Sequence, residues 1–249
     1  MDISIAAETL FQVAGLPITN TFILTLLISV GLILFSWVFL SPKKLRLIPG
    51  RVQSTVEVIF EMLWNLVVDV AGSEHLARKF FPMVATIFFF VLFSNWIELI
   101  PGLGTVGVQH GHSIIPFLRS SSADLNVTLA ISLIAVFSVQ FMGIATIGVA
   151  KYAKKFLVSP LQKPYGVGTF MGILELLGEA TRVISFSFRL FGNIFAGEVL
   201  LIVVLNLVPL LAPVPFLFLE LFVGVVQAAV FAILTLVFFK MATLEAEHA

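Results

Sequence analysis

The feature that most constrains this sequence is a series of long runs without a charged side chain. Two of them are residues 19–40, with 22 residues, and residues 125–150, with 26. A helix needs about 20 apolar residues to cross a hydrocarbon core about 30 Å thick. The whole chain is 59% hydrophobic and only 11% charged, whereas soluble domains carry about 25% charged residues. The sequence therefore predicts an all-α integral membrane protein.

The polar residues divide this sequence into helices of different kinds. Within one membrane domain, residues 1–249, we expect two or more upright spans and a C-terminal helical hairpin: 19–40, then 80–100 with 125–150, then 166–207 with 214–242. Residues 52–77 differ, because polar side chains recur at every fourth position from Gln53 to Asp69 with apolar residues between them. This pattern is typical of an amphipathic helix lying in the membrane interface.

The C-terminal hairpin is too long to stand upright. Residues 166–207 contain no proline, and one helix of this length would extend about 63 Å at about 1.5 Å per residue. That is about twice the hydrocarbon thickness. We therefore expect a helix that is steeply tilted, or broken near Gly178, with Pro209, Pro213 and Pro215 in the turn to the returning helix.

Basic residues are distributed unevenly between the ends of the spans. With the N-terminus outside, eleven of the 14 basic residues fall on the cytoplasmic side, Arg119 falls outside, and Arg182 and Arg189 lie within the membrane. Lys and Arg are enriched in cytoplasmic loops, so we expect an outer N-terminus and a cytoplasmic C-terminus. The short chain shows no signal or transit peptide, which favours a bacterial plasma (inner) membrane, with an organelle inner or thylakoid membrane as the alternative.

Ionisable residues interrupt the apolar sequence of the C-terminal hairpin. Glu175, Arg182 and Arg189 are spaced by seven, so each lies within about 20° of the one before it on a helix. A charge at the bilayer centre costs about 2.5–17 kcal/mol, so such residues are paired, hydrated or functional. Two polar sets result, with Arg189 between them: Glu175, Glu179 and Arg182 toward the cytoplasm, and Asn193, Glu198, Glu220 and Gln227 toward the outside.

This layout favours ion translocation. Carboxylates in a site of low dielectric can exchange protons near neutral pH. Arginine cannot relay a proton, because its pKa exceeds about 12. A permanent cation between two titratable sets would block proton leakage and attract a carboxylate on a partner that slides past. We expect Glu198, which lies about half a turn around the helix from Arg189, to face the returning helix.

The motif around Arg189, SFRLFGNIFAGE, resembles the signature of subunit a of the F-type ATP synthase, the stationary membrane subunit beside the rotating c-ring. The segments SNWIELIPG, DLNVTLAISL and GVVQAAVF match the family as well, so the resemblance covers most of the chain. It implies that the C-terminal hairpin packs against a c-ring whose subunits hold a buried carboxylate. It also implies contacts with peripheral-stalk subunit b, the rest of the F1Fo complex and the lipid bilayer, and no nucleic acid or cofactor.

The resemblance assigns roles to individual residues. The family's essential arginine maps onto Arg189. Polar positions of the outer half-channel map onto Asn193, Glu198, Glu220 and Gln227, and those of the exit half-channel onto Glu175 and Arg182. Glu98 and Asp124, which flank spans on the outer side, are candidates for the channel entrance or ordinary interface residues. Protons would enter from outside, travel on a ring carboxylate through nearly a full rotation, and leave near Glu175.

Nucleotide chemistry belongs elsewhere in such a complex, because the chain has no GxxxxGK[ST] loop. The chain would be a non-catalytic subunit of an ion-transporting enzyme complex. Its coupling ion is left open: protons are the default and sodium the alternative. A stand-alone secondary transporter should show inverted repeats, which the sequence lacks. A membrane scaffold would not need Arg189.

Structural explanations remain for several of these residues. Arg189 could extend to an interface, Arg182 could pair with Glu175 or Glu179, and Glu198 and Glu220 could be polar contacts between helices. The pattern His110-x-His112 with Asp124 resembles a metal site, but histidines in a loop are more often solvated, so no metal is expected. The absence of cysteine excludes thiolate catalysis and Cys-ligated metals.

Overall fold

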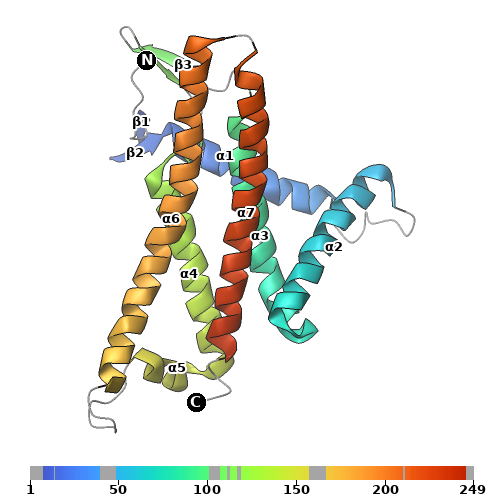
Figure 1. Cartoon of the computed structure of the whole chain (residues 1–249), viewed down its shortest axis with the longest axis vertical. Helices are drawn as coiled ribbons and strands as arrows, with labels where there is room; N and C mark the ends of the chain where they lie inside the picture. Colours follow the sequence, from blue (N-terminus) through green and yellow to red (C-terminus); the bar gives the residue numbers. More distant parts are fainter. Residues whose placement is uncertain are drawn as a thin grey trace.

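The computed structural model of the chain describes residues 8–13, 15–39, 49–100, 107–110, 113–116, 119–156, 167–209 and 211–244. Five helices in these ranges are long and apolar enough to cross a membrane (Figure 1). They are α1 (Asn20–Phe39), α3 (Glu74–Glu98), α4 (Leu125–Ile147), α6 (Val167–Leu207) and α7 (Pro213–Leu244). The expected all-α, membrane-spanning architecture is confirmed.

The amphipathic helix α2 (Arg51–Ala71) is shorter than predicted. It ends at Gly72, whose φ of 79° lies in the left-handed region, and whose N–H donates to the Val68 carbonyl over 2.9 Å. Glycine adopts this conformation without the steric penalty of a Cβ. The Ser73 hydroxyl then accepts from the Leu76 N–H and caps α3. The prediction of one helix over 52–77 is wrong at its end, because residues 74–77 already belong to α3.

The predicted span 125–150 also ends early. Gly148 has a φ of 88°, and α5 (Val149–Phe156) begins directly after it. Tyr152 of α5 is buried, donates a hydrogen bond to Gln140, and packs so closely on Gly143 that a Cβ there would overlap its ring. Residues 149 and 150 therefore belong to a short helix that lies across the ends of α4 and α6 (Figure 1).

The residues before α1 and between α3 and α4 contain strands that the sequence analysis missed. β1 (Thr9–Val13) pairs antiparallel with β2 (Leu16–Thr19), and β3 (Gly107–His110) pairs antiparallel with β4 (Ser113–Pro116). Val108 lies opposite Ile115, and such β-branched residues favour strands.

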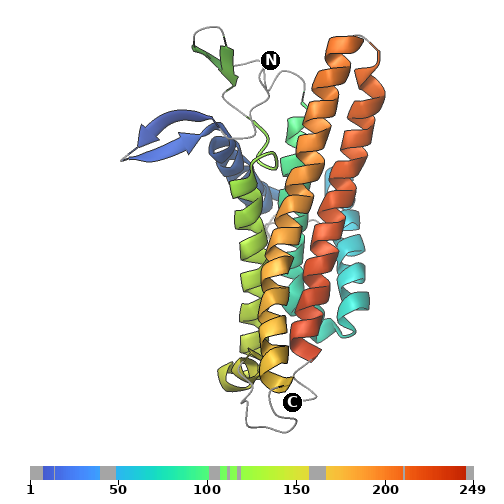
Figure 2. The same cartoon turned by 60° about the vertical axis from the view of Figure 1, so that its left-hand side comes forward.

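The helix α6 is continuous across Gly178, which settles the alternative of a break there. It runs antiparallel to α7 (Figure 2) and lies close to it near the turn that joins them, while Figure 1 shows the two helices diverging toward their other ends. Figure 1 shows α1 running across the long axis of this hairpin rather than along it. The helix α1 and the hairpin therefore cannot both stand perpendicular to one membrane plane.

Apolar packing determines which face of α6 is exposed. Phe186, Leu190 and Ile194 are buried, and the Phe186 ring lies 4.6 Å from that of Phe231 on α7. Phe186, Leu190 and Phe231 belong, with residues of α3 and α4, to one of two apolar clusters, while the other joins α3 to α7 around Phe80 and Phe239. Because α6 turns this stripe inward, the residue next to Leu190, which is Arg189, is on the exposed side.

Candidate functional site

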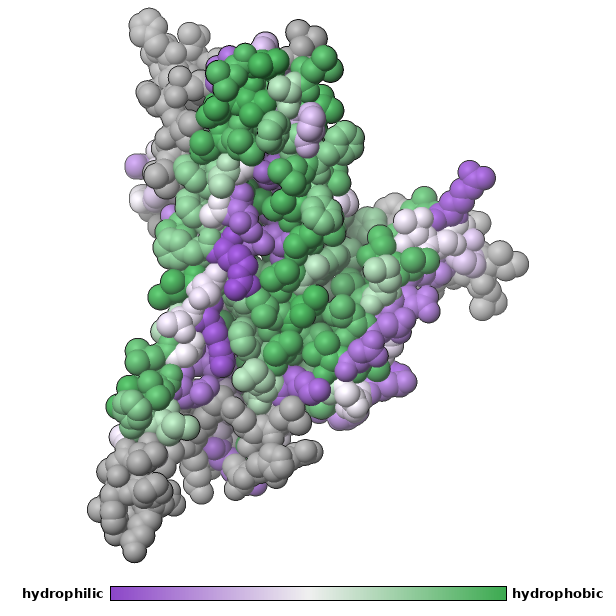
Figure 3. All heavy atoms as spheres, viewed as in Figure 1, coloured by the Kyte–Doolittle hydropathy of each residue, from purple (hydrophilic) through white to green (hydrophobic). Residues whose placement is uncertain are grey.

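A band of polar side chains follows the seam between α6 and α7 on a face that is otherwise hydrophobic (Figure 3). Arg189 and Asn193, one turn apart on α6, are both exposed. Ser185, Gly192 and Ala196 lie on the same side of the helix and are exposed as well. The charged centre of this face is therefore surrounded by small side chains.

Arg189 has no acidic partner within the part of the chain that the structure describes. Its guanidinium carbon lies 5.9 Å from the centre of the Phe186 ring, and no described carboxylate lies within ion-pair distance of it. Residue 189 is also near the middle of a helix that extends from Val167 to Leu207. The structure thus holds a permanent positive charge on the exposed side of an apolar helix.

Asn193 and Gln227, two predicted channel residues, contact each other across the seam. The Asn193 Nδ2 donates to the Gln227 Oε1 over 3.0 Å, and Gln227 is buried. An amide pair of this kind offers further donors and acceptors to water or to an ion. The pair lies one turn from Arg189, toward the turn that joins α6 and α7.

Glu198 forms an ion pair with Arg119, a residue to which the sequence analysis had assigned no role. Its Oε2 lies 3.5 Å from the Arg119 Nη2, with 11% of the Arg119 side chain and 26% of the Glu198 side chain exposed. The ion-pair partner of Glu198 thus comes from the segment before α4, in addition to the returning helix that Glu198 was expected to face. A position half a turn from Arg189 shows that Glu198 faces away from Arg189. It does not show which segment Glu198 meets, and here that segment is the one before α4.

Glu220 fits against α6 at a glycine. A Cβ built on Gly197 would overlap the Glu220 carboxylate, so any other residue there would require this side chain to shift. The neighbouring turn of α7 is fixed to α3: the Trp96 Nε1 donates to the Leu221 carbonyl over 3.2 Å, and the Asn95 Nδ2 donates to the Gly224 carbonyl over 3.4 Å. Gly197, Asn95 and Trp96 thus position a predicted channel residue, and the sequence analysis had not singled them out.

The two candidates for the channel entrance have different surroundings. Glu98, the last residue of α3, interacts electrostatically with Glu198, Glu220 and Arg119, so the structure adds it to the outer set. Asp124 uses both carboxylate oxygens elsewhere: Oδ1 accepts from the Asn126 N–H over 2.9 Å and caps α4, and Oδ2 accepts from the Thr21 hydroxyl over 2.7 Å. These contacts favour the structural explanation of Asp124.

The suggested histidine site finds no support among the described residues. No group of three His, Cys, Asp or Glu residues that could hold a metal occurs among them. His110 ends β3, His112 lies outside the described residues, and Asp124 is engaged as stated above.

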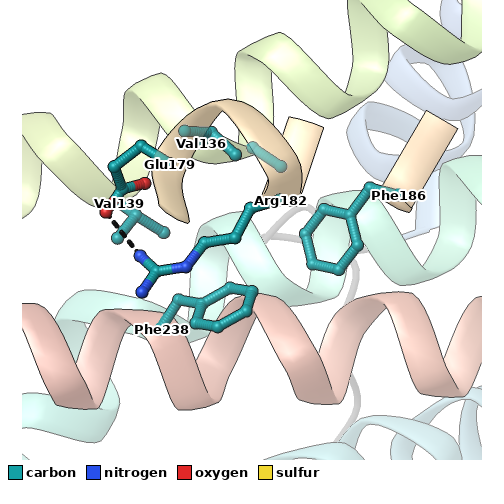
Figure 4. Close-up of a pocket in the computed structure, with 7 residues that line it drawn as sticks. Val136, Val139, Glu179, Arg182, Phe186 and Phe238 are labelled. Carbon is teal, nitrogen blue, oxygen red and sulfur yellow. Dashed lines mark hydrogen bonds and ion pairs between the residues drawn. The ribbon is translucent and has the colours of Figure 1, made fainter. Parts of the chain in front are cut away.

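Arg182 is neutralised within the chain, unlike Arg189. Its Nη1 forms an ion pair with Glu179, its Nη2 lies 3.9 Å from the Glu175 Oε1, and its guanidinium carbon lies 4.4 Å from the centre of the Phe238 ring. Figure 4 shows the guanidinium between the Glu179 carboxylate and this ring. The inner set predicted from the sequence is thus assembled, and the pairing explanation of Arg182 is the one its contacts favour.

The residues of both sets fall inside a region that matches a known family. A model for the family described as ATP synthase A chain matches residues 22–240. The chain belongs to the ATP synthase A chain family. With five helices of spanning length, this member of the family is a multi-pass membrane protein.

Curated relatives agree with this assignment over nearly the whole chain. It is 34% identical to ATP synthase subunit a of Campylobacter concisus over 88% of each chain, and 35% identical to that of Helicobacter pylori over 94% of this chain and 91% of the relative. It is also 34% identical to a Propionigenium modestum protein named ATP synthase subunit a, sodium ion specific, over 99% of this chain and 82% of the relative.

The ion pair between Arg182 and Glu179 allows a first test of how this chain packs. In a Glu179→Gln variant the acidic partner that Arg182 keeps among the described residues is Glu175, at the longer distance, and a partly buried charge that loses its closest partner is destabilising by about 1–3 kcal/mol. We expect the solubilised protein to unfold at a lower temperature, as measured by a thermal shift. The control is Glu74→Gln, which removes an exposed pair with Arg78 and should change stability by less than about 0.5 kcal/mol. Equal shifts in the two variants would contradict the buried pairing.

Proposed function

We propose that this chain is the ion-translocating stator subunit of the membrane sector of an F-type ATP synthase, with the proton as coupling ion. The observation that carries the proposal is the exposed charge of Arg189, which has no acidic partner among the described residues and lies between two sets of titratable residues. The family and the relatives named ATP synthase subunit a support it. Sodium is the second candidate ion, because an equally similar relative is named sodium ion specific.

In this proposal the two polar sets are half-channels. Protons enter from outside through the outer set, which consists of Asn193, Gln227, Glu198, Glu220 and Glu98. They neutralise a carboxylate of a partner ring and, after the ring has turned, leave toward the cytoplasm near Glu175 and Arg182. Moving one charge through the membrane potential releases about 2.3 kcal/mol per 100 mV, which drives the rotation.

Arg189 serves as the barrier between the half-channels. Its charge attracts each arriving ring carboxylate and keeps it ionised, and the guanidinium does not pass a proton on. Arg182 cannot take this role, because Glu179 and Glu175 already compensate its charge. The small residues beside Arg189 let a partner helix approach closely, as small residues do in membrane helix pairs.

The proposal includes the partners and the location. A c-ring lies along α6 and α7, peripheral-stalk subunit b and the remaining F1Fo subunits complete the complex, and nucleotide chemistry occurs in those other subunits. The membrane is the bacterial plasma membrane, with the N-terminus outside. If α1 stands upright, its crossing of the hairpin gives α6 and α7 the steep tilt that their length requires.

Cysteine crosslinking tests the partner directly, because the chain contains no native cysteine. Ala196 is exposed on the Arg189 side of α6. In the assembled complex, we expect Ala196→Cys with a bifunctional thiol reagent to form an adduct with a small membrane subunit that carries an engineered cysteine beside its carboxylate.

The matched control is Ala130→Cys, an exposed position on α4, and it should give no such adduct. Equal labelling at both positions, or labelling of lipid alone at Ala196, would contradict the proposed ring contact.

A further inference from the structure

Arg119 extends from a short segment that is firmly held between three helices. Ser121, Ser122 and Ala123 in this segment are fully buried. The Ser122 hydroxyl donates to the Asn95 Oδ1 over 2.8 Å and ties the segment to α3. Asp124 ties it to α1 and to the start of α4. The backbone that carries Arg119 is therefore fixed at the outer ends of the helices.

The Arg119 guanidinium provides charge compensation that Glu198 does not obtain elsewhere in the described structure. The Glu198 Oε2 is buried and accepts no hydrogen bond from any described group, yet it lies 3.5 Å from the Arg119 Nη2. A largely buried carboxylate without a counter-charge is strongly disfavoured. The ion pair therefore fixes where the Glu198 side chain rests.

Four separate elements contribute charges to this place. Glu98 comes from α3, Glu198 from α6, Glu220 from α7 and Arg119 from the segment before α4, and Glu98 interacts electrostatically with the other three. Three carboxylates repel one another when they share a site of low dielectric. Of the three, Glu198 is the carboxylate whose ion pair with Arg119 the structure shows, at 3.5 Å.

We propose that Arg119 is a positioning residue of the outer half-channel, which holds the Glu198 carboxylate in place beside Glu98 and Glu220 so that the three carboxylates can pass on protons. This role rests on the proposed function. The two arginines then have different roles. Arg119 acts through an acidic partner in its own chain, whereas Arg189 interacts with a carboxylate of another subunit.

The test is the dependence of proton flux on outer pH in vesicles that hold the complete complex, at fixed membrane potential and sodium. We expect Arg119→Gln to lower the maximal flux and to move the midpoint of this dependence upward by about one pH unit, because a carboxylate that loses a neighbouring cation holds its proton more tightly. Arg119→Lys keeps the charge and should restore most of the midpoint. Arg78→Gln, which removes an exposed arginine, should leave it unchanged.

A second variant covers the case in which Arg119→Gln does not assemble. Glu198→Asp leaves Arg119 in place but withdraws the carboxylate by one methylene, and we expect an upward shift of the midpoint here too. An unchanged midpoint in an assembled Arg119→Gln or Glu198→Asp complex would overturn the role of Arg119 alone. Absence of any pH-dependent flux in the unmodified complex would overturn the proposed function and this role with it.

Discussion

Replacing Arg189 by alanine is expected to abolish proton-driven ATP synthesis in vesicles that hold the complete complex. The variant removes a charge that has no acidic partner in the described structure and that faces outward. A ring carboxylate arriving at this position would then keep its proton, and rotation would no longer be coupled to flux. We expect a loss of about 100-fold or more, which corresponds to about 2.7 kcal/mol. Synthesis is measured after an imposed pH difference and membrane potential.

Two comparisons make this result specific. Arg189→Lys keeps a positive charge but lacks the planar guanidinium, so we expect it to retain part of the activity. Arg182→Ala removes an arginine that Glu179 and Glu175 compensate, so we expect lower stability and a smaller loss of synthesis. Coupled synthesis that survives in Arg189→Ala would contradict the assignment of Arg189 as the barrier.

The second large effect is expected at Gly197, a residue without a functional group. A Cβ at this position would overlap the Glu220 carboxylate, and Trp96 and Asn95 hold the adjacent turn of α7 in place. In Gly197→Ala the carboxylate must therefore shift away from α6 and from its place in the outer set. We expect proton flux to fall by about tenfold, which corresponds to about 1.4 kcal/mol.

Gly178→Ala is the matched control for this change. It lies on the same helix, and a Cβ there meets nothing within 4 Å, so the flux should remain as it was. Shortening the displaced side chain in Gly197→Ala with Glu220→Asp should recover part of the flux. If Gly197→Ala and Gly178→Ala lowered the flux equally, the fit of Glu220 against Gly197 would not be the cause.

The sequence was sufficient for the spans and for the order of the polar sets. Uncharged runs of membrane length leave few alternatives, and a spacing of seven places Glu175, Arg182 and Arg189 on related faces of any helix. The exposure of Arg189 depends on more than spacing, because it follows from the burial of Phe186 and Leu190 against other helices.

The periodicity of the sequence does not predict contacts between distant segments. Arg119 and Glu198 belong to different elements, and only the path of the segment before α4 brings them together. Glu220 fits at Gly197 because of the distance between two helices, which no spacing in the sequence encodes. Asp124 is different: an Asp directly before an apolar run is a recognised helix N-cap, and that signal could have identified its structural role.

The sequence alone also does not show which glutamate forms the close ion pair with Arg182. Glu179 is three residues before it and Glu175 seven, and both distances are compatible with contact along one helix face. The structure gives Glu179 the close ion pair and Glu175 the longer contact, with the Phe238 ring on the remaining side.

The central claim is that Arg189 separates two proton paths, and its most direct test is the proton permeability of a complex whose ring cannot turn. The ring is held by the crosslink at Ala196→Cys, and permeability is measured from the decay of an imposed pH difference at fixed sodium. With Arg189 in place, we expect the locked complex to be as impermeable as protein-free vesicles. With Arg189→Ala, we expect the locked complex to conduct protons. Equal permeability of the two locked complexes would contradict the claim.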